Sequence, residues 1–394
     1  MQKKAARPVG APSVPDDLNA KFGCVALLLQ GGGALGAYQA GVYEALAGAG
    51  IHPTWVAGTS IGAINAAIIA GNDPGDRVAK LRKFWEDLTA SPWGVPFEWQ
   101  SAIAQGDIMR TWVNQMSSAV AATAGTPGFY KPRVPPPWLE PPGKLEATSY
   151  YDTSQLKSTL DQLVDFDRIN REKTDIYLSV SAVNVRSGNF IYFTPDTHTI
   201  DANHIMASGA LPPGFPAVEI DGEYYWDGGM VSNTPLQWVF EHGPAHNTLA
   251  FQVDLWNARG RFPRTLQEVA TRQKEIQYSS RTRAGTEQLR QTHKLQRAIE
   301  ELLKELPAEL RDSHAAKILD ESGDTRTYNI VHLIYHAQEY EGDTKDFEFS
   351  RLTMEEHWRA GFNDAKRTLR HQEIFDPTSS PDGVFTFDIE EAGE

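Results

Sequence analysis

The chain has 394 residues, of which 41% are hydrophobic, and this length is enough for a large buried core. Its 37 basic and 51 acidic residues leave a net charge of −14, which disfavours binding to nucleic acid and to anionic lipid. The single cysteine, Cys24, excludes an internal disulfide and favours a reducing, cytoplasmic location, where we expect it to be a buried packing residue.

Residues 1–21 begin with a basic stretch that is followed by Pro and Ala. They contain no apolar segment of the length that a signal peptide requires, and we expect a flexible tail here. No part of the sequence reaches the roughly 18 uninterrupted apolar residues of a membrane span. Any contact with a membrane would therefore be peripheral.

Residues 22–255 are predicted to form the core domain, because short apolar strands alternate there with helices rich in small residues. A strand at 25–29 leads through three glycines into a helix at 37–46, and a second strand at 55–58 leads directly into another helix. This alternation is typical of a parallel sheet with crossover helices. Further strands are predicted at 176–185, 190–194, 223–227 and 248–256, and further helices at 77–88, 201–210 and 235–242.

Residues 91–149 interrupt this pattern and are predicted to form an insertion. Proline is dense between residues 126 and 143, which excludes a regular helix or a central strand there. One interpretation is a surface loop. Another is a lid over a site, because large aromatic side chains are costly to expose unless they cover a pocket or touch an apolar surface. The aromatic residues concerned are Phe97, Trp99, Phe129, Tyr130 and Trp138.

Residues 256–394 are predicted to form a mostly helical extension that packs on or beside the core. Apolar residues at helical spacing indicate one long or broken amphipathic helix over 265–306, which would pack on the chain's own core or on a second copy in a homo-oligomer. A strand is predicted at 328–337, a hairpin at 339–350 and a helix at 354–370.

The glycines after the first strand have the spacing of a dinucleotide-binding loop, since Gly31, Gly33 and Gly36 satisfy GxGxxG. Such a fold needs an acidic residue about 20 positions later, at the end of the second strand, to bind the ribose. Residues 51–58 contain no Asp or Glu, so the sequence argues against a dinucleotide site.

The end of the second strand instead carries GTSIG, at residues 58–62. A GxSxG motif between a strand and a helix is typical of a nucleophile elbow, a sharp turn that needs small residues on both sides of the serine. Gly58 and Gly62 would relieve the clashes in this turn. Ser60 would then hold its hydroxyl exposed at the helix N-terminus, where the helix dipole favours a developing negative charge.

Neighbouring parallel strands end at one edge of a sheet, which would bring the glycine loop close to this serine. The backbone N–H groups of Gly31, Gly32 and Gly33 could then converge on a carbonyl oxygen that becomes negative during acyl transfer. These three glycines are therefore predicted to form an oxyanion hole.

A serine nucleophile also requires a base. In WDGG, Asp227 ends a strand just before two glycines, which would leave its carboxylate at the edge of the sheet, where it could take the serine proton directly. Without the other motifs, this segment would instead be interpreted as an ordinary Asp-Gly turn with no catalytic role. A triad on an α/β-hydrolase fold, with a late histidine as base, is an alternative for the site; His242 is interpreted as a capping or surface residue.

The motifs GGGALG, GTSIG and DGG, in this order, resemble the patatin-like phospholipase family, and so do ASGALPPGFP at 207–216 and DGGMVSNTP at 227–235. The similarity covers roughly residues 22–255. It implies a three-layer α/β/α fold with a mainly parallel central sheet and a Ser-Asp dyad of Ser60 and Asp227. It also implies hydrolysis of acyl esters of lipids through an acyl-enzyme, with Gly31, Gly32 and Gly33 as oxyanion donors and without metal or cofactor.

One residue departs from the family pattern. Many members carry Arg or Lys in the position before the last glycine of the loop, where this chain has Leu35. The missing charge favours an uncharged ester or a small acyl substrate. A carboxylesterase, a thioesterase, an acyltransferase and a non-catalytic lipid-binding module remain the alternatives.

Overall fold

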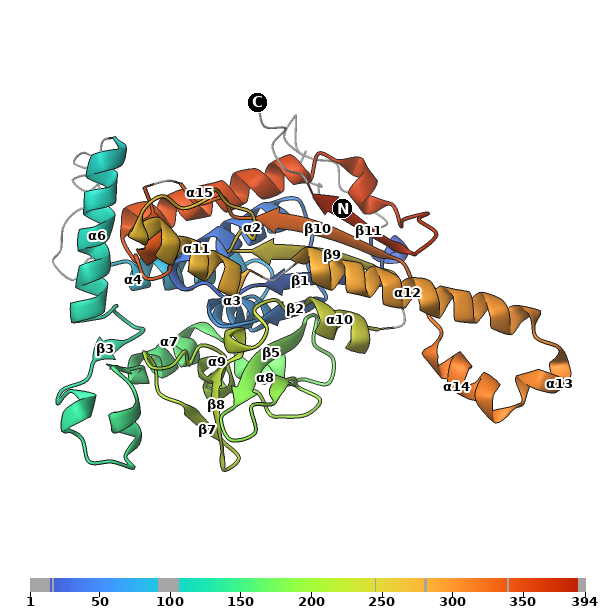
Figure 1. Cartoon of the computed structure of the whole chain (residues 1–394), viewed down its shortest axis with the longest axis horizontal. Coiled ribbons are helices and arrows are strands. Elements are labelled where there is room, and N and C mark those ends of the chain that lie inside the picture. The colour runs from blue at the N-terminus through green and yellow to red at the C-terminus, as the bar shows by residue number, and fades with distance from the viewer. Residues whose placement is uncertain are drawn as a thin grey trace, which may run out of the picture.

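The computed structural model describes residue 15 and residues 18–90, 106–244, 246–279, 282–338 and 340–388 (Figure 1). The predicted aromatic residues Phe97 and Trp99 lie outside these ranges. The strands are β1 (Cys24–Leu29), β2 (Trp55–Gly58), β3 (Lys131–Pro132), β4 (Tyr151–Asp152), β5 (Tyr177–Asn184), β6 (Phe190–Phe193), β7 (Val218–Ile220), β8 (Glu223–Asp227), β9 (Thr248–Asp254), β10 (Tyr328–Ile334) and β11 (Val384–Asp388). The helices are α1 (Leu18–Lys21), α2 (Ala37–Gly48), α3 (Ile61–Ala70), α4 (Arg77–Leu88), α6 (Asp107–Ala124), α7 (Ser154–Leu163), α8 (Phe166–Ile169), α9 (Ala202–Ser208), α10 (Leu236–His242), α11 (Leu266–Tyr278), α12 (Thr282–Glu305), α13 (Ala308–Arg311), α14 (His314–Ser322) and α15 (Arg351–Thr368).

Within the described residues, nine strands form one mixed sheet in the order β11-β10-β9-β1-β2-β5-β8-β7, with β6 paired to β5. The strands from β11 to β5 are parallel, and β8 and β6 run antiparallel to β5. Strands such as β1 and β9 are buried along their whole length, as expected for parallel strands covered on both faces. The predicted fold class, an α/β fold with a mainly parallel central sheet, is confirmed.

The register of the sheet brings distant parts of the sequence to one edge. Leu29, the last residue of β1, is paired with Gly58 of β2 and with Val253 of β9, so these three strands end at the same level of the sheet. On the far side of β5, Asp227 pairs with Ala182, two residues beyond the partner of Gly58. The carboxyl ends of the parallel strands therefore meet the end of β8, on the side of α6 and α11 (Figure 1).

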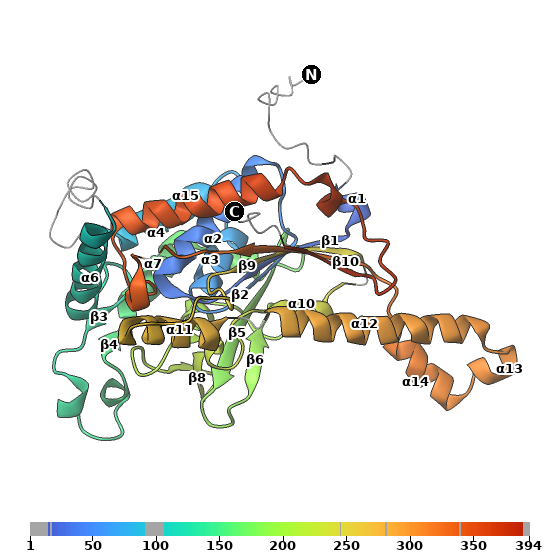
Figure 2. The same ribbon diagram turned by 45° about the horizontal axis from the view of Figure 1, so that its top comes forward.

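Side chains of β1 alternate between two helical layers, as the period of a strand requires. Val25, Leu27 and Leu29 belong to a large core that includes residues of α2, α3, α4 and α15. Cys24 and its alternate neighbours instead pack with α10 on the opposite face, so the cysteine is buried. Helices thus cover both faces of the sheet and form the three layers (Figure 2).

The C-terminal part of the chain is joined to this core by close helix packing. A Cβ at Gly41 of α2 would lie 1.9 Å from the carbonyl oxygen of Trp358, and a Cβ at Gly361 of α15 would lie 2.0 Å from that of Tyr38. The two glycines let α2 and α15 approach backbone to backbone. The same region supplies β10 and β11 to the sheet, whereas α12, α13 and α14 form an arm that extends past the body (Figures 1 and 2).

Two predicted segments have a different structure. Residues 340–350 contain a short 3₁₀ helix, Gly342–Thr344, and no strand, so the predicted hairpin is wrong in the described part of this segment. The insertion contains the 18-residue helix α6 before its proline-rich part, and the proline-rich part itself holds one 3₁₀ helix, Pro137–Leu139, the short strand β3 and a bridge between Thr126 and Tyr130. Among the described residues, no helix has the length and apolar character needed to cross a bilayer.

Candidate active site

Ser60 occupies a sharp turn between β2 and α3. Its backbone angles, φ 57° and ψ −125°, lie in a region that favours glycine and that other residues adopt only under strain. A Cβ at Gly58 would lie 2.4 Å from the carbonyl oxygen of Gly62, and a Cβ at Gly62 would lie 2.2 Å from that of Leu29. The turn therefore requires glycine two residues before and two residues after the serine.

Asp227 ends β8 in a buried position, with 2% of the residue exposed. Its Oδ1 accepts a hydrogen bond of 2.7 Å from the N–H of Gly229, and both Asp227 and Ser60 line the same cavity. Burial removes water from the carboxylate and raises its pKa to about 7, although the neighbouring Ser60 hydroxyl and the N–H of Gly229 lower it. A carboxylate with this pKa is matched to proton transfer near neutral pH.

Gly31 lies against the serine, since a Cβ there would be 3.0 Å from the Cβ of Ser60. Its N–H donates to Oδ1 of Asn233 at 3.1 Å. Its carbonyl accepts from Nδ2 of Asn233 at 3.0 Å and from Nε1 of Trp256 at 2.9 Å. The first glycine of the loop is therefore fully engaged within the protein.

The next two glycines differ from the first. Within the part of the chain that the structure describes, the N–H groups of Gly32 and Gly33 have no hydrogen-bond acceptor. Gly33 has a positive φ of 56°, and a Cβ there would lie 2.1 Å from the carbonyl oxygen of Asp346. The same carbonyl accepts from the N–H of Ala34 at 2.8 Å, which holds the loop from the C-terminal side.

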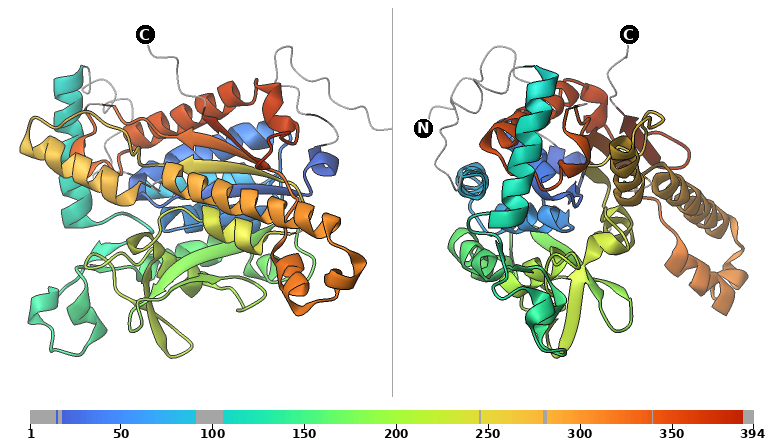
Figure 3. Two further views of the ribbon diagram at one scale, coloured as in Figure 1. Left: turned by 45° about the vertical axis from the view of Figure 1, so that its right-hand side comes forward. Right: turned by 60° about the vertical axis from the view of Figure 1, so that its left-hand side comes forward.

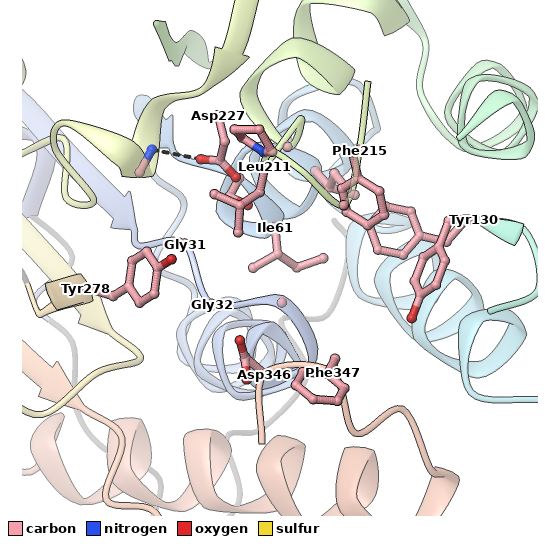
Figure 4. A pocket seen from close by; sticks show the side chains of 18 of the residues that line it. Gly31, Gly32, Ile61, Tyr130, Leu211, Phe215, Asp227, Tyr278, Asp346 and Phe347 are labelled. Carbon is pink, nitrogen blue, oxygen red and sulfur yellow. Dashed lines mark hydrogen bonds between the residues drawn. The ribbon is translucent and has the colours of Figure 1, made fainter. Parts of the chain in front are cut away.

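These residues share a cavity of about 410 Å³ (Figure 4). Ser60, Asp227 and the three glycines line one side. The lining also contains an aromatic cluster in which Phe129, Tyr130 and Tyr151 lie around Phe215, with ring centroids about 5 to 6 Å apart. The aromatic lining residues are Phe129, Tyr130, Tyr151, Phe215, Trp256, Tyr278, Phe347 and Phe349. Phe129 and Tyr130 of the insertion thus line a pocket, whereas Trp138 is exposed.

The C-terminal region supplies one wall of the cavity. Asp346, Phe347 and Phe349 line it, and Figure 4 shows the first two across the cavity from Asp227. Lys274 of α11 binds the Asp346 carboxylate at 2.8 Å and the carbonyl of Asp343 at 2.9 Å. These bonds turn the segment toward α11 and the glycine loop, which explains why residues 340–350 do not form the expected hairpin.

The ionisable residues that line the cavity bear on the choice between an Asp base and a His-containing triad. Among the described residues that line the cavity, the ionisable acids are Asp227 and Asp346, and there is no Lys, Arg or His. His242 is exposed on α10, where its ring stacks on that of Trp238 with a centroid distance of 3.6 Å. The described cavity therefore offers no imidazole for a triad.

Asn233 and the C-terminal wall are site residues that the sequence did not reveal. Asn233 belongs to the DGGMVSNTP stretch, so its motif was visible, but its bonds to Gly31 were not. Asp346 and its neighbours carry no local signal, because they reach the cavity through the packing of α15 and α11.

Comparisons with known proteins agree with these observations. The model of the patatin-like phospholipase family matches residues 27–239, which is more than half of the chain. A second family model, described as patatin phospholipase, matches residues 276–380. No curated protein matches the chain.

Two solved structures are similar to the chain. VipD from Legionella pneumophila is 16% identical, with a TM-score of 0.41, over 91% of this chain and 67% of its own. The type III effector protein ExoU is 12% identical, with a TM-score of 0.33, over 89% of this chain and 53% of its own, so the match spans about half of ExoU. With a family model covering more than half of its residues, the chain belongs to the patatin-like phospholipase family, whose members hydrolyse acyl esters of lipids.

Proposed function

We propose that this chain is a serine acyl-ester hydrolase that uses a Ser60–Asp227 dyad. Asp227 takes the proton of the Ser60 hydroxyl while Oγ attacks the ester carbonyl, and the carbonyl oxygen becomes an oxyanion. Collapse of this intermediate breaks the ester bond, and the alcohol leaves with a proton from Asp227. Water then attacks the acyl-enzyme in the same way, and the acid product leaves while Ser60 regains its proton.

The oxyanion is stabilised in this proposal by the N–H groups of Gly32 and Gly33. Their lack of acceptors among the described residues supports this role, whereas the N–H of Gly31 already donates to Asn233. Gly31 is then the residue through which Asn233 anchors the loop. Removal of one such donor typically costs about 3 to 4 kcal/mol of transition-state stabilisation.

The acyl group of the substrate occupies the aromatic side of the cavity, and the ester is uncharged near the scissile bond. The lining supports this choice, because its described residues provide carboxylates and no cation for a phosphate. Leu35, where many family members have a basic residue, is fully buried in the core. The observation that carries the proposal is that one cavity brings together the strained Ser60, the buried Asp227 and two glycine amides that have no acceptor among the described residues.

The test compares purified wild type with Ser60→Ala on 4-nitrophenyl esters of increasing acyl length, on neutral glycerides, on phospholipids and on acyl thioesters. We expect the wild type to release 4-nitrophenol and Ser60→Ala to have no activity above background. A fluorophosphonate should label Ser60, as identified by mass spectrometry. Hydrolysis that survives in Ser60→Ala, or a wild type that neither hydrolyses nor becomes labelled, would refute the dyad. An alcohol acceptor in the assay separates hydrolysis from acyl transfer.

A further inference from the structure

Helix α6 exposes an apolar face and buries a polar one. Ile108, Trp112 and Met116 follow one another at intervals of four residues, and they are 90%, 57% and 49% exposed. The buried residues of the helix include Arg110 and Asn114 instead. Because an amphipathic helix normally turns its apolar side inward, the orientation of α6 indicates that its outer side meets an apolar surface.

A buried cation holds α6 in this orientation. Nη2 of Arg110 donates to Thr353 at 2.9 Å and pairs with the carboxylate of Glu356 at 2.7 Å, both on α15. The guanidinium also lies over the ring of Tyr340, 5.5 Å from its centroid. Turning the helix over would remove this charge from its partners, so the exposed apolar face is a fixed property of the fold.

Three more segments that line the cavity also expose large apolar side chains. Residues 126–151 contribute Tyr130 to the lining, the turn after Asp227 contributes Gly229, and α11 contributes Tyr278. Figure 3 shows α6, residues 126–151 and α11 at the same end of the molecule. Their exposed side chains include Trp138, Leu139, Met230, Val231, Phe262 and Leu266, the last two at the start of α11 or just before it.

Charges on these segments nearly balance, in contrast to the net charge of −14 for the whole chain. Helix α6 carries one acid and one base, and α11 carries two of each. Residues 126–151 carry Lys131, Arg133 and Lys144 against Glu140 and Glu146. A surface of this kind is not repelled by a lipid layer without net charge.

We propose that α6, residues 126–151, the turn after Asp227 and α11 form a docking face for a zwitterionic lipid surface, from which the substrate enters the cavity. The choice of lipid as occupant rests on the proposed function, because the acyl esters of lipids are presented at such surfaces. The aromatic residues fit this occupant: Trp112, Trp138 and Tyr150 have rings with an apolar body and a polar atom, which favour the boundary between lipid and water.

The test measures the partition of the full chain onto phosphatidylcholine vesicles by sedimentation. Two double variants change the face, Ile108→Ser with Trp112→Ser and Trp138→Ser with Leu139→Ser. The matched control is Leu295→Ser with Leu302→Ser on α12, which are 63% and 53% exposed but lie on the arm. We expect each face variant to lower the partition coefficient about tenfold or more and the control to change it less than about twofold, because only the face loses buried apolar area.

Circular dichroism and hydrolysis of a water-soluble ester serve as controls for folding and for the site, and neither should change in the three double variants. Ser60→Ala should still bind vesicles, so failure of the proposed chemistry and failure of the docking face are distinguishable. The docking face is refuted if the wild type does not sediment with vesicles, or if the α12 control loses as much binding as the face variants. It is also refuted if a wild-type dimer without lipid becomes monomeric in the α6 variant, because a second copy would then cover the face.

Discussion

Asn233 binds both backbone polar groups of Gly31, accepting from its N–H at 3.1 Å and donating to its carbonyl at 3.0 Å. The same amide donates to the carbonyl of Tyr278 at 2.8 Å, so one buried side chain links the glycine loop to the end of α11. Gly31 is thereby tied to a residue 202 positions away in the sequence. Among the described residues, the glycine N–H groups of the loop that lack an acceptor are those of the two following glycines.

We predict that Asn233→Ala lowers kcat for a soluble ester by about 10- to 1000-fold with little change in KM. The side chain does not touch the reacting atoms in the proposed mechanism, but without it the loop loses the hydrogen bonds that orient the oxyanion donors. Loss of one such donor typically lowers kcat by about 100- to 1000-fold. Steady-state kinetics measure the split between kcat and KM. Ser232→Ala, at the preceding position, is the control and should behave as wild type. An unchanged kcat in Asn233→Ala would show that the loop keeps its geometry without the amide.

The raised pKa of Asp227 predicts the pH dependence of the reaction. A base must be ionised to accept the serine proton, and burial raises the pKa of this carboxyl to about 7. We expect kcat/KM for an uncharged ester to rise about tenfold per pH unit below pH 7 and to level off above it. Initial rates between pH 5 and pH 9 test this. A profile that is already flat at pH 5 would mean that Asp227 is not the base.

The same raised pKa predicts that the ionised Asp227 carboxylate destabilises the fold above about pH 7. The pKa of Asp227 is raised from an ordinary value of 3.8 to about 7, so the neutral acid stabilises the fold fully below about pH 3.8. This contribution is lost as the pH rises to about 7, because the folded chain must then carry a buried charge. Asp227→Asn should therefore be more stable than wild type at pH 8, by at most about 4 kcal/mol, and nearly equal to it at pH 4. Urea unfolding at both pH values measures the difference, and a destabilised Asn variant at pH 8 contradicts the prediction.

Backbone strain at Ser60 predicts a difference between two inactive variants. Glycine adopts a φ of 57° without a steric penalty, whereas alanine retains the Cβ that causes it. We expect Ser60→Gly to be about 1 to 2 kcal/mol more stable than Ser60→Ala. Thermal unfolding compares the two variants, and both should lack esterase activity. Equal midpoints would show that the turn carries no strain.

Local patterns predicted much of the core. Buried strands were expected at 25–29, 55–58 and 248–256, and β1, β2 and β9 begin and end within two residues of those limits. The patterns failed where distant contacts decide the structure. Helix α6 is not among the predicted elements, and its orientation is decided by α15, where Glu356 pairs with Arg110. The hairpin expected at 339–350 is absent from the described part of that segment, where Lys274 and the glycine loop hold Asp346 instead.

The sequence by itself determined the first half of the turn at Ser60, because a Cβ at Gly58 would meet the backbone of Gly62, four residues away, whereas the need for glycine at position 62 arises from Leu29 on the neighbouring strand. It also pointed to Asp227, because a strand that ends before two glycines leaves its last side chain at the edge of a sheet. Only the tertiary structure decided which amides of the loop stay unpaired, which carboxyl loses its water and which segments line the cavity. Those properties depend on groups such as Asn233 and Asp346, which are brought into contact by sheet register and helix packing and leave no periodic trace in the chain.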